Sequence, residues 1–226
     1  MEVIILAGGL GVRLRDVIQD IPKPMAPIRT KPFLSYLLDW VLKYPVTKII
    51  LAVGYKSEVI KSHFGDNFNG IPLFYAQEQE PLGTGGAILN ALNYVDGPDV
   101  TIINGDTYFP IDLELFNEFH EISNGALSIA LKEMVDFDRY GTVNKDGDII
   151  IGFEEKKPLE IGLINGGIYV LSKKFLEDLN LPAKFSFEQE ILEKQASTGI
   201  LRALVFTETF IDIGIPEDYK KACDWL

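Results

Sequence analysis

Short runs of apolar residues alternate with segments of helical hydrophobic spacing in the first half of the chain. A strand that is covered on both faces is apolar at successive positions, so the runs predict buried strands over Val3–Leu6, Lys48–Val53, Leu73–Gln77 and Val100–Asn104. Apolar residues at helical intervals predict helices over Phe33–Leu42, Ser57–Phe64 and Thr84–Tyr94, with Ser57 as an N-cap. The alternation indicates an α/β fold with a mostly parallel sheet that helices cover on both faces.

The pattern changes after residue 110, where hairpin and capping signals appear. The predicted elements there are a helix over Leu115–Ile122, strands over Leu127–Leu131, Gly141–Val143, Ile149–Phe153, Ile168–Leu171 and Leu201–Phe206, a helix from Ser186 to Gln195, and a final helix from Pro216. Lys145–Asp148 is typical of a hairpin turn, and Ser186 with Gln189 forms a capping box. Because no linker or repeat interrupts the chain, we expect residues 1–226 to form a single domain. Residues 1–110 would be its nucleotide-binding half and residues 111–226 its substrate-binding half.

Composition and charge narrow the range of functions. The 226 residues are 47% hydrophobic, which is enough for a sizeable core. The net charge of −12 argues against general nucleic-acid binding, which needs a basic surface. Cys223 is the single cysteine, so an internal disulfide is excluded and a reducing compartment is favoured. The chain opens without the basic region of a signal peptide, and no apolar run reaches the ~20 residues that span a bilayer, so we expect a cytoplasmic protein.

A glycine-rich loop, Leu6–Leu14, follows the first predicted strand directly. Glycines there let the backbone approach a ligand closely, and free N–H groups can hold phosphate. The loop is not a dinucleotide-binding fingerprint, because Leu14 stands where the third glycine belongs, and the Gly-Lys-Ser/Thr ending of a P-loop is missing. Basic residues gather beside the loop, at Arg13, Arg15, Lys23, Arg29 and Lys31. Such charge attracts a triphosphate, although a tight turn next to a solvated basic loop is the alternative.

The loop and the segment after it resemble the sugar-1-phosphate nucleotidyltransferases, also called nucleotide-sugar pyrophosphorylases. That family joins a Gly-Gly-x-Gly-x-Arg-Leu loop to a Lys-Pro-Met segment, and this chain has Gly8–Leu14 followed by Pro22–Met25. The resemblance implies a three-layer Rossmann-like fold with a mostly parallel mixed central sheet. It also implies that Arg13 and Lys23 stabilise the triphosphate and the leaving group. The implied nucleotide-binding residues of this region are Leu6, Ala7, Gly8, Gly9, Gly11, Arg13 and Lys23.

Glu78–Ala87 resembles the base-recognition loop of the family, in which Pro81, Gly83 and Thr84 would shape the base pocket. Glu78 lies five residues before Gly83. Guanine presents two adjacent donors, and a carboxylate accepts from both, whereas an amide offers a single acceptor oxygen. Glu78 therefore favours GTP, with an ordinary strand-end surface residue as the alternative. The bland interpretation of the loop is a strand-to-helix connection capped by Thr84.

Two aspartates match the metal-binding positions of the family. Asp106 follows the predicted strand Val100–Asn104, at the sheet edge where open α/β folds bind ligands. Asp212 lies in Ile211–Pro216, which resembles the second metal motif, although Phe210 stands where the family often has tryptophan. Mg²⁺ accepts a couple of carboxylates with phosphate oxygens and water, so this pair would suffice. Taken singly, either residue is also typical of a helix cap or a turn.

Three further segments match the sugar side of the family: Arg139–Val143, Phe153–Pro158 and Asn165–Tyr169. The resemblance implies that Gly141 lies against the sugar, Glu155 near its hydroxyls and Asn165 in hydrogen-bonding reach. Lys156 would hold the sugar phosphate, but an extra lysine before Pro158 leaves Lys157 open as well. The alternatives are hairpin charges for the acidic and basic residues, and a β-bulge at Gly166 and Gly167.

The resemblance implies nucleotidyl transfer, with Arg13, Lys23 and Asp106 as the catalytic residues and Mg²⁺ held by Asp106 and Asp212. Within the family, the chain is similar to the short bacterial enzymes that act on D-glycero-α-D-manno-heptose 1-phosphate and GTP to give GDP-heptose for surface polysaccharide. A mannose-1-phosphate guanylyltransferase, a short uridylyltransferase and a catalytically inactive nucleotide-sugar sensor are the alternatives. The C-terminal β-helix that other members of the family carry is not expected here. The sequence indicates neither a membrane nor a nucleic acid as a partner. A homo-oligomer is compatible with the sequence. His63 and His120 are interpreted as structural.

Overall fold

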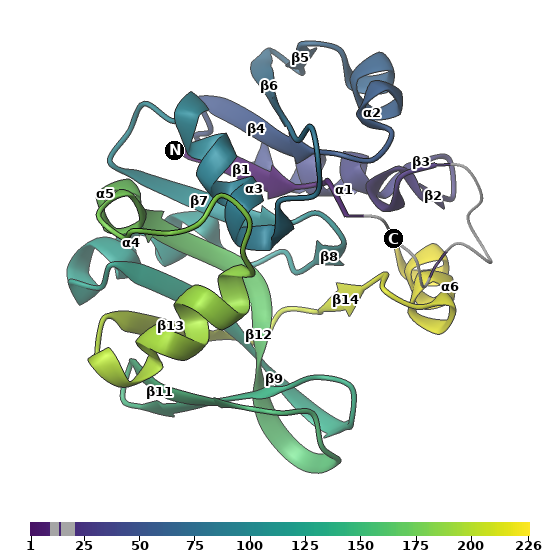
Figure 1. The fold of residues 1–226 in the computed structure, drawn as a ribbon. Coiled ribbons are helices and arrows are strands. Elements are labelled where there is room, and N and C mark those ends of the chain that lie inside the picture. Colours follow the sequence, from purple (N-terminus) through teal and green to yellow (C-terminus); the bar gives the residue numbers. More distant parts are fainter. Residues whose placement is uncertain (10–13, 15–20) are drawn as a thin grey trace.

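A continuous mixed sheet of ten strands runs through both halves of the chain, in the order β10-β11-β13-β9-β12-β7-β1-β4-β6-β5. The computed structural model describes residues 1–9, 14 and 21–226. Figure 1 shows the purple to teal strands of the first half in the upper part of the molecule and the green strands β9, β11 and β12 in the lower part. The strands are β1 Glu2–Leu6, β4 Lys48–Val53, β5 Asn67–Phe68, β6 Ile71–Gln77, β7 Asp99–Asn104, β9 Leu127–Phe137, β10 Thr142–Asp146, β11 Ile149–Glu154, β12 Leu159–Ser172 and β13 Leu201–Phe206.

Strands β1, β4, β6 and β7 of the first half pair in parallel, as their apolar runs indicate. β1 is hydrogen-bonded to β4 on one side and to β7 on the other, and β4 pairs with β6, all in parallel. The long strand β12 then adds antiparallel to β7 and to β9, which joins the two halves edge to edge. This mixed, mostly helix-covered sheet confirms the predicted α/β fold class.

Helices and short segments connect and cover the strands. The helices are α1 Phe33–Val41, α2 Ser57–Phe64, α3 Gly83–Ala91, α4 Leu113–Ser123, α5 Lys173–Glu177 and α6 Pro216–Trp225, with the 3₁₀ turns η2 Lys23–Met25, η3 Leu92–Tyr94 and η5 Ala196–Thr198 and the π-helix η4 Glu188–Glu193. Two small ribbons lie outside the main sheet: β2 Pro27–Ile28 with β3 Lys31–Pro32, and β8 Thr107–Tyr108 with β14 Ile211–Asp212. None of the helices in the described ranges is long and apolar enough to cross a bilayer.

The core lies in two layers, one on each face of the sheet. Along β1, Ile5 belongs to the cluster under α1, α2, α4 and α6, whereas its neighbour Ile4 belongs to the cluster under α3, α5 and η4. Both side chains are fully buried. Alternate residues of a strand point to opposite faces, so a strand with helices on both sides must be apolar throughout. Burial of each such side chain stabilises the fold by about 1.5–3 kcal/mol. The strands are therefore firmly held, and the loops that follow β1, β4 and β7 start from fixed positions.

Several local predictions need correction. Ser57 is the first helical residue and not the N-cap, because Lys56 takes that place with a left-handed φ of 51°. The predicted helix from Ser186 is mostly the π-helix η4, although the Ser186 hydroxyl does accept from the Gln189 N–H at 3.3 Å. β9 and β12 extend well past their predicted apolar cores as a partly exposed ribbon. At Asn165–Tyr169 the register between these strands shifts, which confirms the bulge considered for the glycine pair.

Candidate active site

A cavity of about 530 Å³ opens at the carboxyl ends of β1, β4 and β7, where Leu6, Ala52 and Asn104 contribute to its wall. Ligands of open α/β sheets bind at this edge, because the loops that leave neighbouring parallel strands diverge there. The predicted nucleotide residues that line it are Leu6, Gly8, Gly9, Lys23, Glu78, Pro81, Gly83, Thr84 and Asp106. We refer to it as the nucleotide cavity.

Other predicted nucleotide residues lie elsewhere. Ala7 is fully buried behind the cavity wall and donates its N–H to the Ala52 carbonyl at 2.8 Å. Gly11 and Arg13 lie outside the described residues. Gly54 and Tyr55 line the cavity although the sequence interpretation did not select them. The position of Gly54 directly after a parallel strand is the signal that marks it.

Glu78 is half-buried at one wall of the nucleotide cavity. Its Oε2 accepts the Leu82 N–H at 3.1 Å, so the carboxylate is tied to the N-cap of α3. A Cβ added to Gly8 would lie 3.3 Å from Glu78 Oε1, which shows how closely the glycine loop approaches this side chain. Desolvation by burial raises the pKa of the Glu78 carboxyl, and the Leu82 N–H opposes that shift in part. Glu78 is therefore not the surface residue that the alternative interpretation described.

Lys23 joins two aspartates that are far apart in the sequence. Its Nζ lies 2.6 Å from Asp106 Oδ2 and 3.7 Å from Asp212 Oδ1. The small ribbon creates this meeting, because Asp212 on β14 is paired with Thr107 on β8, next to Asp106. Gly105 allows the approach, since a Cβ there would lie 2.4 Å from the Leu6 carbonyl oxygen. The Lys23 side chain is only 10% exposed, so the three charges interact in a partly desolvated place.

The donor set at Asp106 and Asp212 suits Mg²⁺. Both side chains are carboxylates, they converge on one cationic group, and the nucleotide cavity beside them leaves room for phosphate oxygens. Mg²⁺ usually takes one or two carboxylates and completes its shell with phosphate and water. Within the described part of the chain, no group of three or more His, Cys, Asp or Glu residues could form a metal site from protein ligands alone. A metal here would therefore depend on the substrate for its remaining ligands.

A second cavity, of about 470 Å³, lies on the other side of Asp212. We refer to it as the sugar-side cavity, and its lining is Asp138, Arg139, Tyr140, Gly141, Lys156, Ile164, Asn165, Asp212, Gly214, Ile215 and Asp218. Asp106 and Lys23 line the nucleotide cavity while Asp212 lines the sugar-side cavity, and the Lys23 contacts link them. The two cavities therefore meet at this charged group.

The structure distinguishes the two neighbouring lysines. Lys156 lines the sugar-side cavity, whereas Lys157 forms an ion pair with Glu154 at the surface. Glu155 is exposed and does not contribute to the lining that the structure describes. Asn165 is held in place, because its Nδ2 donates to the Tyr169 hydroxyl at 2.9 Å and its Oδ1 accepts the Gly167 N–H at 2.9 Å.

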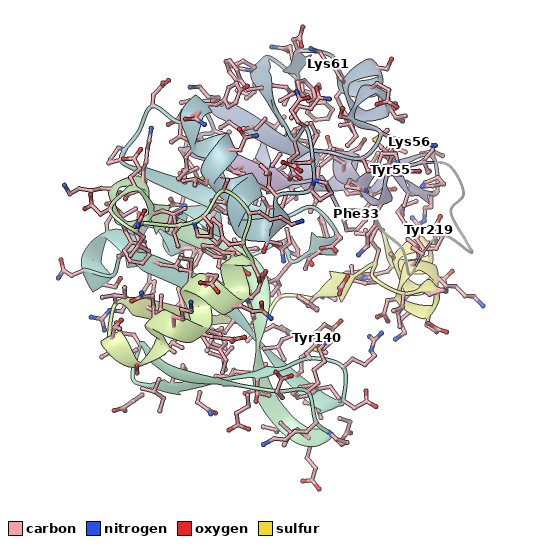
Figure 2. All side chains as sticks on the ribbon, in the orientation of Figure 1. Phe33, Tyr55, Lys56, Lys61, Tyr140 and Tyr219 are labelled. Atoms are coloured by element: carbon pink, nitrogen blue, oxygen red, sulfur yellow. The ribbon has the colours of Figure 1, made fainter. Side chains whose placement is uncertain are left out.

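An ion pair between Arg139 and Asp218 closes one wall of the sugar-side cavity. Asp218 lies in the first turn of α6 and its side chain is 8% exposed. Figure 2 shows Tyr140 at the upper rim of the lower strands, in the space between them and α6, which carries Tyr219. Burial, with the nearby charge of Asp212, raises the pKa of the Tyr140 phenol to about 12, so this hydroxyl stays neutral and can donate a hydrogen bond. No sequence motif indicates Asp218 as a residue of this cavity, since an aspartate in a first helical turn is common at any helix N-terminus.

The family model of nucleotidyl transferases matches residues 2–225. The chain belongs to this family. It is 51% identical over 220 residues to D-glycero-α-D-manno-heptose 1-phosphate guanylyltransferase of Campylobacter jejuni, covering 97% of each chain. It is 48% identical over 222 residues to the enzyme of the same name from Aneurinibacillus thermoaerophilus, covering 98% of this chain and 96% of the relative.

Solved structures agree with the family assignment. HddC from Yersinia pseudotuberculosis complexed with GMP-PN is 44% identical and superimposes with a TM-score of 0.87, over 99% of this chain and 98% of that chain. The predicted family and fold class are thus confirmed, and the chain is a nucleotidyltransferase. The two cavities and the charged group between them are the candidate active site of this nucleotidyltransferase.

Proposed function

We propose that this nucleotidyltransferase transfers GMP from GTP to D-glycero-α-D-manno-heptose 1-phosphate, giving GDP-heptose and pyrophosphate. The relatives named above support the heptose and the guanylyl group, since two heptose 1-phosphate guanylyltransferases share about half of its residues. The position of Glu78 is the observation that supports guanine as the base. Its carboxylate lines the nucleotide cavity and provides two acceptor oxygens for the two donors on the Watson–Crick edge of guanine.

The chemistry is an in-line displacement at the α-phosphorus. An oxygen of the sugar phosphate forms the new O–P bond, and the bond to the β-phosphate oxygen breaks so that pyrophosphate leaves with the electron pair. The attacking phosphate is already anionic, so no strong general base is needed, and positioning with charge neutralisation supplies the catalysis. We expect Lys156 to hold the attacking phosphate in the sugar-side cavity. Lys23 would neutralise the triphosphate and the leaving pyrophosphate.

Asp106 and Asp212 would hold Mg²⁺, which supplies further neutralisation of the phosphate charge when it is bound. Lys23 would then exchange its carboxylate partners for phosphate oxygens. Arg13 remains a predicted partner of the triphosphate from the sequence. We also expect the reaction to take place in the cytoplasm, in keeping with a chain whose single cysteine is Cys223.

The test is a matrix of GTP, UTP, dTTP, CTP and ATP against heptose 1-phosphate, mannose 1-phosphate and glucose 1-phosphate, with pyrophosphate release as the readout. We expect the highest kcat/KM for GTP with heptose 1-phosphate. Glu78→Gln should reduce the preference for GTP by about tenfold or more, because a charge-assisted pair is worth ~1–3 kcal/mol. A preference for another base in the wild type would overturn the base assignment, and a preference for mannose 1-phosphate would overturn the sugar assignment.

A further inference from the structure

A segment from the second half of the chain packs directly against the loop at the base side of the nucleotide cavity. We call Leu82–Gly86, which is the N-cap and first turn of α3, the base loop, and Ala183–Glu188 the buttress. The Gly85 N–H donates to the Phe185 carbonyl at 3.1 Å, and the Phe185 N–H donates to the Leu82 carbonyl at 3.0 Å. About a hundred residues separate these partners in the sequence. The base loop is therefore held from outside the nucleotide half.

The glycines of the base loop are needed for this packing. A Cβ on Gly83, whose φ is +76°, would lie 2.5 Å from the Phe185 carbonyl oxygen. One on Gly85 would lie 2.1 Å from the Phe185 ring, and one on Gly86 would lie 2.4 Å from the Ala183 carbonyl oxygen. Carbon atoms pack no closer than about 3.5 Å, so each added methyl group would push the two segments apart. The packing against the buttress therefore requires glycine at these three positions, independently of any contact that they make with the base.

A polar network fastens the two segments at Thr84. The Thr84 hydroxyl donates to Glu188 Oε2 at 2.7 Å and accepts the Phe187 N–H at 2.9 Å. The Ser186 hydroxyl donates to the same carboxylate oxygen at 2.8 Å. A hydroxyl carries a single proton, and that of Thr84 goes to Glu188, so the Thr84 hydroxyl has no donor left for a nucleotide. The two hydrogen bonds hold the Thr84 side chain in a fixed place in the lining of the nucleotide cavity.

We propose that Glu188 is a positioning residue for the nucleotide. Glu188 is absent from the described lining of the nucleotide cavity and reaches it only through Thr84. Hydrogen bonds to an ionised acceptor are about twice as strong as neutral ones, so the carboxylate fixes the rotamer of Thr84 and anchors the base loop to the buttress. Because the Leu82 N–H of the same segment is bonded to Glu78, the position of the Glu78 carboxylate depends on this anchor. The naming of guanine as the base rests on the function proposed above, whereas the positioning role does not.

The test measures nucleotide binding and not only turnover. The probe is guanosine 5′-(β,γ-imido)triphosphate with Mg²⁺, titrated by calorimetry into wild type, Glu188→Ala and Glu188→Gln. We expect Glu188→Ala to weaken binding about tenfold, with a smaller loss in Glu188→Gln, which keeps one acceptor oxygen for Thr84. Glu190→Gln is the matched control, because Glu190 lies in the same helix and is ion-paired with Lys194 at the surface. That control should bind as the wild type does.

A double-mutant cycle separates positioning from general loosening. Thr84→Val removes the hydroxyl, and if Glu188 acts through it, Thr84→Val combined with Glu188→Gln should bind no more weakly than Thr84→Val alone. The KM for heptose 1-phosphate should stay within about twofold in Glu188→Gln. The positioning role would be overturned if the losses of binding free energy in the two single variants simply added in the double variant. It would also be overturned if Glu188→Gln raised the KM values for GTP and for heptose 1-phosphate equally.

The outcomes also distinguish this inference from the proposed function. If the wild type does not bind the guanine probe but binds the uridine or adenosine analogue, the guanine assignment fails, and the cycle is repeated with the analogue that binds. If the wild type binds the guanine probe and Glu188→Ala binds it equally well, Glu188 is not a positioning residue. Should Glu188→Ala fail to fold, Glu188→Gln and Thr84→Val still decide the question.

Discussion

Lys23 Nζ lies 2.6 Å from Asp106 Oδ2, within hydrogen-bonding distance of a carboxylate that we propose as a metal ligand. The same ammonium group is 3.7 Å from Asp212 Oδ1, so one lysine neutralises both members of the proposed pair. A divalent cation held by Asp106 and Asp212 would compete with this ammonium group for the same two carboxylates. A triphosphate in the nucleotide cavity would relieve this competition, because its oxygens would offer Lys23 another partner.

The first prediction follows from this competition. Lys23→Met keeps the length of the side chain but removes its charge, so the variant should bind Mn²⁺ at least tenfold more tightly than the wild type when no nucleotide is present. Electron paramagnetic resonance of Mn²⁺ measures the free ion directly. Turnover of the same variant should fall by about 10²–10³, the usual loss for one electrostatic stabiliser. Equal Mn²⁺ affinity in both proteins would contradict the competition.

The second prediction concerns the carboxylates themselves. Asp106→Asn and Asp212→Asn should each reduce turnover heavily while the thermal midpoint stays close to that of the wild type, because each change preserves the shape of the side chain. Chelation with EDTA should abolish pyrophosphate release, and added Mg²⁺ should restore it. Pyrophosphate release that continues in EDTA would show that the reaction needs no metal.

The third prediction compares the neighbouring lysines. Lys156→Ala should raise the KM for sugar phosphate by about tenfold with little change in the KM for GTP, since Lys156 lines the sugar-side cavity. Lys157→Ala is the matched control and should have a small effect, because Lys157 is ion-paired with Glu154 at the surface. Steady-state kinetics with each substrate varied in turn provides both constants. The opposite ranking would assign the phosphate to Lys157.

The fourth prediction uses the raised pKa of Glu78. Burial disfavours the charged carboxylate in the folded protein, so the fold binds the Glu78 proton more tightly than the unfolded chain does, and stability falls as the pH rises through the folded pKa. Glu78→Gln cannot ionise and keeps an acceptor for the Leu82 N–H. Its thermal midpoint should exceed that of the wild type near pH 7, and the difference should shrink towards pH 4.

Glu80→Gln is the control for this effect, because Glu80 is exposed in the same loop. Differential scanning fluorimetry of the three proteins between pH 4 and 8 makes the comparison. A difference in thermal midpoint between Glu78→Gln and the wild type that stays constant from pH 4 to 8 would show that the ionisation of Glu78 does not affect stability. A Glu78→Gln variant that is more stable yet less selective for GTP would indicate a side chain kept for binding.

The sequence predicted the elements whose signal is local. The predicted strand Lys48–Val53 has the same bounds as β4. A strand that is covered on both faces is apolar at successive positions, and this run is visible in the sequence alone. Lys23 and Asp106, which both line the nucleotide cavity, were predicted as site residues because the segments that carry them resemble motifs of the family. The ribbon formed by β9 and β12 was underestimated, since past Leu131 its exposed and half-buried residues lack the apolar run of a buried strand.

Contacts between distant segments could not be predicted in this way. Glu188 and Thr84 are 104 positions apart, and nothing in either local pattern indicates that they meet. The same holds for Arg139 and Asp218, which are 79 positions apart. A pair of this kind depends on how the sheet brings two loops together, and neither spacing nor propensity carries that information. The sequence could indicate candidate residues for the site but not the contacts that hold them in place.

The pairing of β12 with β7 has a consequence for how the two halves can be handled as pieces. A cut near residue 110 would place β7 and β12 on different fragments, so each strand would lose the other as its neighbour. Each fragment would then have a long open edge that carries buried residues such as Ile102 and Val170. Open apolar edges recruit strands from other chains. Fragments expressed alone should therefore aggregate, and exchanging one half with that of a relative would require the two strands at the seam to be exchanged together.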